Sequence, residues 1–362
     1  MLASGGKKLS QQTGRATYAV GLLALALTAC APPAAQPAAA PVRQAAPASA
    51  PTTAVSAQAP APAALEKIVV STSDPGIVFS PLYVGIARGF FREEGLEPDV
   101  QVIKPDVSLA ALANDQDVAY QATIGTVSRG AANGLPVKAI SFWFEKTLFY
   151  LMARPEIQSV QDLKGQVVGV PTLGGSGELA LRRMLTEAGL EPQVDVSIIQ
   201  LAPGNGRIGA IVAGGAAASV FTPPDDAVAE EQGLHRVPSP SEAIPLPFSG
   251  IGTSEKRLQE NPGQVERVLR ASLKTLRFMR DNHQETAQII AGATDIQPDV
   301  ALRAFESMAA TLSPDGWASP EALQGQLESA VTPGEPLPSD AQVFDSRPLK
   351  AAQQSLGIAG RP

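Results

Sequence analysis

The chain has 362 residues, 17% of them charged, and a formal net charge of −7 at pH 7; this length suggests two domains or one large one. The acidic balance and an aromatic content of 5% argue against a nucleic-acid partner, because phosphate backbones are repelled and bases find few rings to stack on. A single cysteine and two histidines exclude an intrachain disulfide and leave little material for a metal site or Ser-His-Asp hydrolysis, so no metal or other cofactor is expected.

The N-terminal residues 1–29 are typical of a lipoprotein signal peptide. A basic start through Arg15 precedes an apolar run from Tyr18 to Ala29, which is shorter than the ~20 residues of a membrane-spanning helix. The run ends in the sequence LTAC, which resembles a bacterial lipobox with Cys30 as its cysteine. We therefore predict lipidation at Cys30, and an extracytoplasmic chain that contacts the bacterial membrane only through this N-terminal lipid.

Residues 30–64 hold the predicted lipidated cysteine and a tether. The segment after Cys30 is almost entirely Ala, Pro, Gln, Ser, Thr and Val, with Arg43 as its one charge. Such a composition cannot bury apolar side chains, and its prolines block helix and sheet formation. We expect a semi-extended linker between the membrane and a folded domain.

The composition changes abruptly after Leu65, where strand and helix patterns begin to alternate. A proline-led helix start at Ser80-Pro81 and a stop at Gly95 bound the first predicted helix. The predicted order is strand 67–72, helix 80–94, strand 100–103, helix 109–113, strand 118–120, helix 126–132 and strand 137–144. This alternation is typical of an α/β fold in which helices cover a mostly parallel sheet on both faces.

A second series of the same kind follows. Its expected strands are 148–153, 166–171, 194–201, 218–222 and 248–253, and its helices are 177–188, 207–213 and 225–232. A third region is helical, beginning at Asn261-Pro262 and including 286–291 and 299–310. We therefore divide the folded part into lobe 1 (65–145), lobe 2 (146–260) and a C-terminal helical region (261–362). The segment EEGLEPDVQV, which begins at Glu93, is similar to EAGLEPQVDV, which begins at Glu187. This internal similarity fits two lobes of similar construction, or it reflects a generic helix-to-strand connector.

The succession of motifs resembles the substrate-binding proteins of ABC importers, in the sulfonate/taurine/nitrate and thiamine-pyrimidine-precursor group. The matching stretches, in the family's order, are SPLYVGIARGFF from Ser80, GLPV from Gly134, DLKGQVVGV from Asp162, IGAIVAG from Ile208 and Asn261-Pro262. The resemblance covers most of residues 66–290. It implies a two-lobed clamshell of the type II periplasmic-binding-protein fold, with crossover strands near 143–148 and after Phe248. It also implies a ligand cleft between the lobes and C-terminal helices that pack on lobe 1.

Polar residues at the ends of predicted strands are the candidate ligand contacts, because α/β sheets bind ligands at the carboxyl ends of their strands. Glycines before a helix also let the backbone approach an anionic group. Any of these residues could instead be a cap or turn residue. Trp143 and Phe144 could stack on a flat ligand or simply pack in the core. The further candidates are Ser73, Asp74, Ser80, Tyr83, Gln121 and Thr123 in lobe 1, and Thr172, Gly175, Ser176, Asn205 and Thr222 in lobe 2.

Two enzyme alternatives deserve comparison with this interpretation. Gly175–Ala180 and Gly204–Gly209 fit dinucleotide-binding patterns, and Asp225 follows the second at the expected offset. However, the helix after the second pattern is short, Pro223-Pro224 separate Asp225 from its strand, and an exported protein meets little NAD. Pyrimidine synthases of the same fold use a cysteine-rich segment that this chain lacks. The paired acids Glu93-Glu94, Asp225-Asp226 and Glu230-Glu231 are interpreted as solvated helix faces.

These observations predict a monomeric solute-binding lipoprotein rather than an enzyme. The expected partners are a small molecule and an ABC permease with its cytoplasmic ATPase. The ligand class stays open among sulfonate, taurine, nitrate, pyrimidine and aromatic acid. A ligand-sensing lipoprotein of the same fold remains an alternative.

Overall fold

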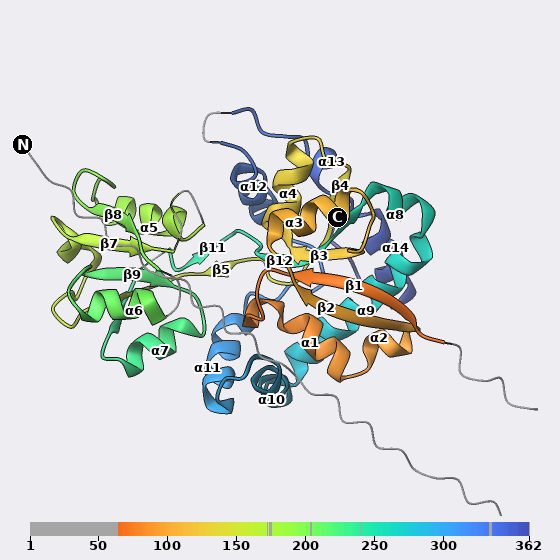
Figure 1. Cartoon of the computed structure of the whole chain (residues 1–362), viewed down its shortest axis with the longest axis horizontal. Coiled ribbons are helices and arrows are strands. Elements are labelled where there is room, and N and C mark those ends of the chain that lie inside the picture. Colours follow the sequence, from red (N-terminus) through yellow and green to blue (C-terminus); the bar gives the residue numbers. More distant parts are fainter. Residues whose placement is uncertain are drawn as a thin grey trace, which may run out of the picture. The chain divides into compact units, whose positions relative to one another are not determined.

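The computed structural model describes residues 64–361, apart from positions 172, 174, 175, 203, 204, 240, 333 and 334. The predicted signal peptide, Cys30 and nearly all of the tether lie outside the described residues. Among the helices of this described part, none combines the length and apolar character needed to cross a membrane. Figure 1 shows two main groups of strands, each with helices beside it.

The first sheet is built from strands that are far apart in the sequence. It contains β1 (Glu66–Thr72), β2 (Leu96–Val102), β3 (Tyr120–Thr123), β4 (Val137–Phe142) and β12 (Ser249–Ser254), in the order β2-β1-β3-β12-β4. β1 is parallel to β2 and β3, whereas β12 is antiparallel to both β3 and β4. The late strand β12 therefore lies between two strands of the first series.

Two glycines allow β12 to fit between β3 and β4. A Cβ on Gly250 would overlap the carbonyl oxygen of Ser141, and a Cβ on Gly252 would lie 2.6 Å from a methyl carbon of Val127. Both approaches are closer than van der Waals contact permits, so only glycine suits these positions.

Four helices accompany these strands, and one prediction about them is wrong. They are α1 (Ser80–Ala87), α2 (Phe90–Glu93), α3 (Pro105–Ala113) and α4 (Ile124–Ala132), with a 3-10 turn, η1 (Ile77–Phe79), before α1. The helix predicted over residues 80–94 is two helices, because Gly89 has a left-handed backbone with φ of 77° and ends α1. Glycine adopts this conformation without steric cost, so it ends helices readily.

The second sheet belongs to the second series. It contains β6 (Tyr150–Ala153), β7 (Val167–Val170), β8 (Ser197–Gln200), β9 (Ala218–Phe221) and β10 (His235–Val237), in the order β10-β6-β9-β7-β8. Helices α5 (Ser176–Glu187), α6 (Asn205–Val212) and α7 (Asp225–Glu231) alternate with them. β7 is parallel to β8 and β9, while β6 is antiparallel to β9 and β10. Both large sheets are therefore mixed. Their parallel pairs join strands that alternate with helices along the chain, as the sequence pattern predicts.

The chain passes between the two sheets along a short two-stranded ribbon. β5 (Thr147–Leu148) on the outward path pairs with β11 (Ala243–Ile244) on the return path, in an antiparallel arrangement. The Thr147 hydroxyl also donates to the carbonyl oxygen of Leu246, at 2.6 Å. The outward crossover lies where the sequence predicted it, near 143–148, whereas the returning crossover lies at residues 243–246, before Phe248 and not after it, because β12 of the first sheet already begins at Ser249.

The C-terminal region is helical, with α8 (Glu255–Glu260), α9 (Pro262–Asp281), α10 (His283–Thr294), α11 (Pro298–Ala309), α12 (Pro320–Ser329), α13 (Asp340–Val343) and α14 (Arg347–Ser355). α9 begins at Asn261-Pro262 as predicted and packs against α1, α2 and α14. α12 begins at Ser319, whose hydroxyl accepts from the backbone N–H of Ala322. α12 and α13 pack against α4 of the first series.

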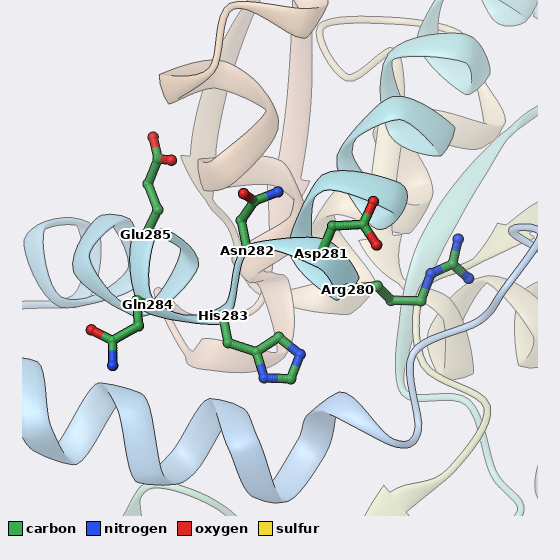
Figure 2. A pocket seen from close by; sticks show the side chains of 6 residues that line it. All are labelled: Arg280, Asp281, Asn282, His283, Gln284 and Glu285. Carbon is green, nitrogen blue, oxygen red and sulfur yellow. The ribbon is translucent and has the colours of Figure 1, made fainter.

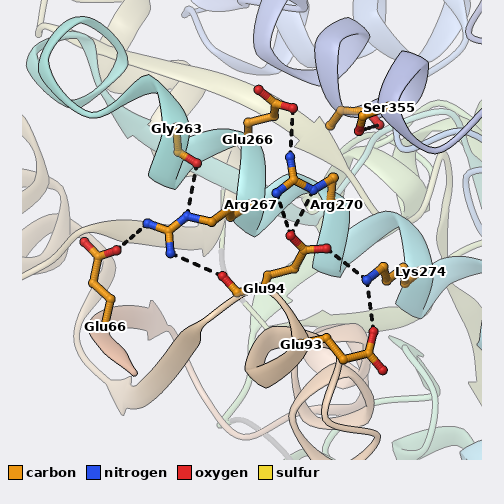
Figure 3. Close-up of polar contacts among 10 residues, drawn as sticks. Glu66, Glu93, Glu94, Gly263, Glu266, Arg267, Arg270, Lys274 and Ser355 are labelled. Carbon is orange, nitrogen blue, oxygen red and sulfur yellow. Dashed lines mark hydrogen bonds and ion pairs between the residues drawn. The ribbon is translucent and has the colours of Figure 1, made fainter. Parts of the chain in front are cut away.

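A network of charges joins α9 to the first sheet and to α2 (Figure 3). Arg270 donates twice to Glu94, at 2.6 and 2.9 Å, and the Lys274 ammonium lies 2.9 Å from both Glu94 and Glu93. Burial alone would raise the pKa of Glu94, but Arg270 and Lys274 outweigh it and lower this pKa. Only 9% of the Glu94 side chain is exposed, so the interpretation of Glu93-Glu94 as a solvated pair is wrong for Glu94.

Candidate functional site

The loop after β1 carries two of the predicted site residues. The Ser73 hydroxyl donates to Asp74, at 2.8 Å, and Asp74 also accepts from the backbone N–H of Gly76, at 2.7 Å. Asp74 is exposed on the surface. These bonds hold its carboxylate at the carboxyl end of β1, where a ligand of a parallel sheet would bind.

Strand β3 ends beside β1 and contributes the next two predicted residues. The register pairs Ser71 with Gln121, so the two strands end at the same edge. Thr123 is the N-cap residue of α4, yet its side chain makes no capping hydrogen bond. Opposite Thr123, the Ser249 hydroxyl donates to the carbonyl oxygen of Val78, at 2.6 Å, and ties the η1 turn to the sheet.

Buried polar atoms without hydrogen-bond partners gather at this edge. Among the side chains that the structure describes, they include a hydroxyl oxygen each of Ser80 and Thr123, and Oε1 of Gln121. All three residues are at most 7% exposed. An unpaired buried polar group costs about 1–3 kcal/mol, and native proteins keep few of them. Gln121 and Thr123 lie at the end of β3, and Ser80 begins α1, so this edge of the sheet is the candidate binding site.

Tyr83 lies on α1 near the same loop. Burial raises the pKa of the Tyr83 phenol, and the negative charge of Asp74 raises it further. A side-chain hydrogen bond with Thr72 lowers this pKa. Of the predicted set, the structure joins Ser73 and Asp74 by a hydrogen bond, and Tyr83 is half-buried on α1.

Trp143 and Phe144 lie in the core. Trp143 is 1% exposed and its indole N–H donates to the Ser272 hydroxyl in α9, at 2.8 Å; Phe144 is 3% exposed. This placement favours the core-packing alternative for both rings. A different aromatic pair lies at the strand ends: the ring centroids of Phe79 and the half-buried Phe248 are 6.0 Å apart.

Arg207, on α6 beside the second sheet, is a buried charged residue. Its side chain is 5% exposed, its guanidinium carbon lies 4.3 Å from the centroid of the Phe221 ring, and Nη2 lies 3.6 Å from a carboxylate oxygen of Asp225. Nε has no hydrogen-bond partner. Burial lowers the pKa of Arg207, although Asp225 opposes this shift. The buried cation therefore has donors to spare for a ligand.

Asp225 and Asp226 follow β9. The Asp225 side chain is 40% exposed, whereas one carboxylate oxygen of Asp226 is fully buried, so the interpretation of the two as a solvated pair is wrong for Asp226. Burial raises the pKa of both carboxyl groups. For Asp225 the Arg207 cation opposes the shift and the charge of Asp74 adds to it. Asp74 follows β1 of the first sheet, whereas Asp225 follows β9 of the second. The charge of a residue that follows β1 therefore influences a carboxyl group that follows β9.

The other predicted residues of the second series begin its helices or follow its strands. Thr222 comes directly after β9, and Ser176 and Asn205 are the first residues of α5 and α6. Because β7, β8 and β9 run parallel, these residues share one sheet edge. Thr172 and Gly175 lie outside the described residues. A ligand role for the predicted residues stays a prediction.

A surface hollow lies elsewhere, at the junction of α9 and α10 (Figure 2). Its lining comes from one continuous segment, residues 280–285, and includes none of the strand-end residues. The His283 ring packs edge-on against Phe305, at 5.3 Å between centroids. The hollow therefore adds nothing to the candidate site.

Residues 77–286, more than half of the chain, match the profile of the NMT1/THI5-like family. The chain belongs to this family. The riboflavin-binding protein RibY of Chloroflexus aurantiacus is 30% identical to this NMT1/THI5-like protein over 267 residues, which are 70% of this chain and 71% of RibY.

Solved structures show that the NMT1/THI5-like protein has the two-lobed type II periplasmic-binding-protein fold. The periplasmic sulfonate-binding protein SsuA of Methylobacillus flagellatus KT superposes with a TM-score of 0.64 at 17% identity, over 82% of this chain and 96% of SsuA. The periplasmic nitrate-binding protein NrtA of Synechocystis PCC 6803 gives 0.61 at 13% identity, over 82% and 90%. The predicted family group and clamshell fold are confirmed, and the relatives support a role in binding solutes.

Sequence reasoning missed Thr72, Arg207 and Phe248 as site candidates. Arg207 carried a signal, since it begins the helix predicted after the strand 194–201. Thr72 and Phe248 are neighbours of residues that the pattern did single out. Their burial and orientation depend on how β1 and β12 meet in the first sheet.

Proposed function

We propose that this NMT1/THI5-like protein is the extracytoplasmic solute-binding lipoprotein of an ABC importer. Its ligand would be held between the strand ends of the two sheets and released unchanged. The observation that carries the proposal is the set of buried, unpartnered polar atoms at those strand ends, from Gln121 and Thr123 in the first sheet to Arg207 beside the second. A ligand that satisfies donors on both sides stabilises the closed form, because it binds that form more tightly.

A flavin-like heterocycle is the first candidate ligand. The support is the 30% identity to a protein named for riboflavin binding, together with the half-buried rings of Tyr83 and Phe248. A flat heterocycle with several carbonyl and ring-nitrogen acceptors suits both stacking and the spare donors of Arg207. A sulfonate or nitrate ligand is the second candidate, favoured by the same buried cation and by the fold shared with SsuA and NrtA.

The test is a titration of the full-length protein, purified in detergent, with riboflavin, nitrate, taurine and an alkanesulfonate. Riboflavin fluorescence should be quenched on binding, and the protein should melt at a higher temperature, by the equivalent of about 2.7 kcal/mol at a hundredfold excess over Kd. If only nitrate or sulfonates stabilise the protein, the flavin class is wrong. If a recovered compound differs in mass from the one added, the protein is an enzyme and the proposal fails.

Attachment to the membrane and the transport partners are also part of the proposal. Cys30 would carry the lipid, residues 30–64 would form the tether, and the monomeric domain would dock on a permease coupled to a cytoplasmic ATPase. Labelling with a fatty-acid analogue should mark the wild type and not Cys30→Ser. Uptake of labelled riboflavin that requires a permease would separate import from the sensing role.

The dinucleotide-enzyme alternative receives less support. Asp225, the acidic residue at the expected offset, lies 3.6 Å from Arg207 and so has a cation of its own chain beside it. Titration with NADH, followed by its fluorescence, would reveal binding if this alternative were right.

A further inference from the structure

Gln326 on α12 is a fully buried polar side chain. It is 0% exposed, and within the described residues neither Nε2 nor Oε1 has a hydrogen-bond partner. A buried carboxamide can make four hydrogen bonds and is costly when it makes none. Gln326 also lies outside residues 77–286, the part that matches the family.

The position of Gln326 connects the C-terminal region to the candidate site. Its Nε2 lies 3.9 Å from the place that a Cβ of Gly125 would occupy, in the first turn of α4. The neighbouring Gly325 packs so closely on Pro245, between β11 and β12, that a Cβ would overlap the Pro245 carbonyl oxygen. α12 therefore lies against both the start of α4 and the returning crossover.

The start of α4 offers hydrogen-bond donors beside this amide. The first backbone N–H groups of a helix have no intrahelical acceptor. The N–H of Ile124 donates to the carbonyl oxygen of Phe248, at 3.2 Å. The Thr123 side chain accepts no hydrogen bond from the N–H groups that follow Ile124. Thr123 is 7% exposed, and its hydroxyl oxygen is buried without a partner. Gly125 has no side chain, so a ligand atom can approach the backbone closely.

We propose that Gln326 and the N-terminus of α4 form a polar subsite that holds one edge of the bound ligand. A carboxamide presents an acceptor and a donor side by side, as in its paired contacts to adenine. The complementary ligand group is an imide, in which a carbonyl stands next to an N–H; the pyrimidinedione ring of a flavin has such an edge. The inference rests on the proposed solute-binding function and adds a specificity-determining residue to it.

The experiment compares Gln326→Met with Gln324→Met in the full-length protein. Gln324 is the matched control, since it lies two residues earlier on α12, is exposed and hydrogen-bonds to Glu328. Each protein is titrated with riboflavin and with 3-methylriboflavin, whose imide N–H is replaced by a methyl group. Thermal unfolding without ligand is recorded in parallel.

Gln326→Met should weaken riboflavin binding at least about tenfold, or about 1.4 kcal/mol, and Gln324→Met should leave it unchanged. Methylation should weaken binding to the wild type and have little effect on Gln326→Met. Equal riboflavin affinity of both variants overturns the inference and leaves the proposed function intact.

If riboflavin does not bind the wild type, the flavin class is wrong, and thermal unfolding of the ligand-free proteins tests the role of Gln326. The probe is then whichever of nitrate, taurine and an alkanesulfonate raises the melting temperature of the wild type most. An unpartnered amide destabilises the ligand-free protein, so Gln326→Met should melt at the same temperature or roughly 2 °C higher. A lower melting temperature of Gln326→Met, with an undiminished shift by that probe, means that the amide serves the fold and overturns the inference.

Discussion

Glu94→Gln tests the charge network that attaches α9 to the first sheet. The change keeps the shape of the side chain and removes one negative charge from between Arg270 and Lys274. Breaking a fully buried pair costs about 3–5 kcal/mol, and an exposed pair contributes about 0–1 kcal/mol. Glu94 is 9% exposed, but Arg270 and Lys274 are 22% and 28% exposed and retain Glu266 and Glu93 as partners. We therefore expect a loss of about 1–3 kcal/mol at pH 7.

The assay is urea unfolding of the full-length protein, followed by tryptophan fluorescence across a pH series. The pKa of Glu94 is lowered in the folded state, so its contribution is present above its ordinary value of 4.5 and disappears as the pH falls through the folded-state pKa. The difference between wild type and variant should shrink in that window. Glu93→Gln is the control, because Glu93 is 56% exposed and contacts only the Lys274 ammonium. Equal losses for the two variants, or a difference that grows in acid, would refute the reasoning.

Three further predictions concern the site. Gly125→Ala should leave stability unchanged or raise it by up to about 1 kcal/mol, since the new Cβ meets only Gln326 at 3.9 Å; riboflavin titration should show weaker binding, and unchanged binding would exclude the start of α4 as a contact. Arg207→Lys keeps the charge but loses the planar group over Phe221, so riboflavin affinity should fall at least about tenfold, whereas the exposed Arg303→Lys should bind normally. Burial raises the pKa of Asp226, so the ionised carboxylate destabilises the folded state. Asp226→Asn should therefore unfold at a higher urea concentration than the wild type at pH 7. This difference in stability should disappear as the pH falls toward 3.8, the ordinary pKa of an aspartate, because the carboxyl group is then protonated in the folded state.

Local pattern predicted the long elements of the fold well. Buried apolar runs bounded by glycine and proline located β1, β7 and α9, because burial on a sheet and helical spacing leave distinct periods in the sequence. β10 has three residues and β11 has two, which is too short for any period to show. The pairing of β12 between β3 and β4 depends on contacts more than 100 residues apart in the chain, and no local signal carries such information.

The site was predictable only in part. Strand ends correctly directed attention to Ser73, Asp74 and Thr123 as neighbours at one sheet edge. A ring near a crossover, such as Trp143, has the same sequence signature whether it faces a ligand or the core, and only its bond to Ser272 decides between them. Gln326 has no signature at all, since it becomes buried by packing against a helix some 200 residues earlier.

The insertion of β12 has a consequence for how this protein is made. The central position beside β3 stays empty until residues 249–254 have left the ribosome, and by then every strand of the second sheet has been synthesised. The first half cannot form its sheet alone, because a fragment ending near residue 145 would expose the unpaired edges of β3 and β4. The nascent chain must therefore postpone completion of its first sheet, a delay that the proposed export of an unfolded chain would require.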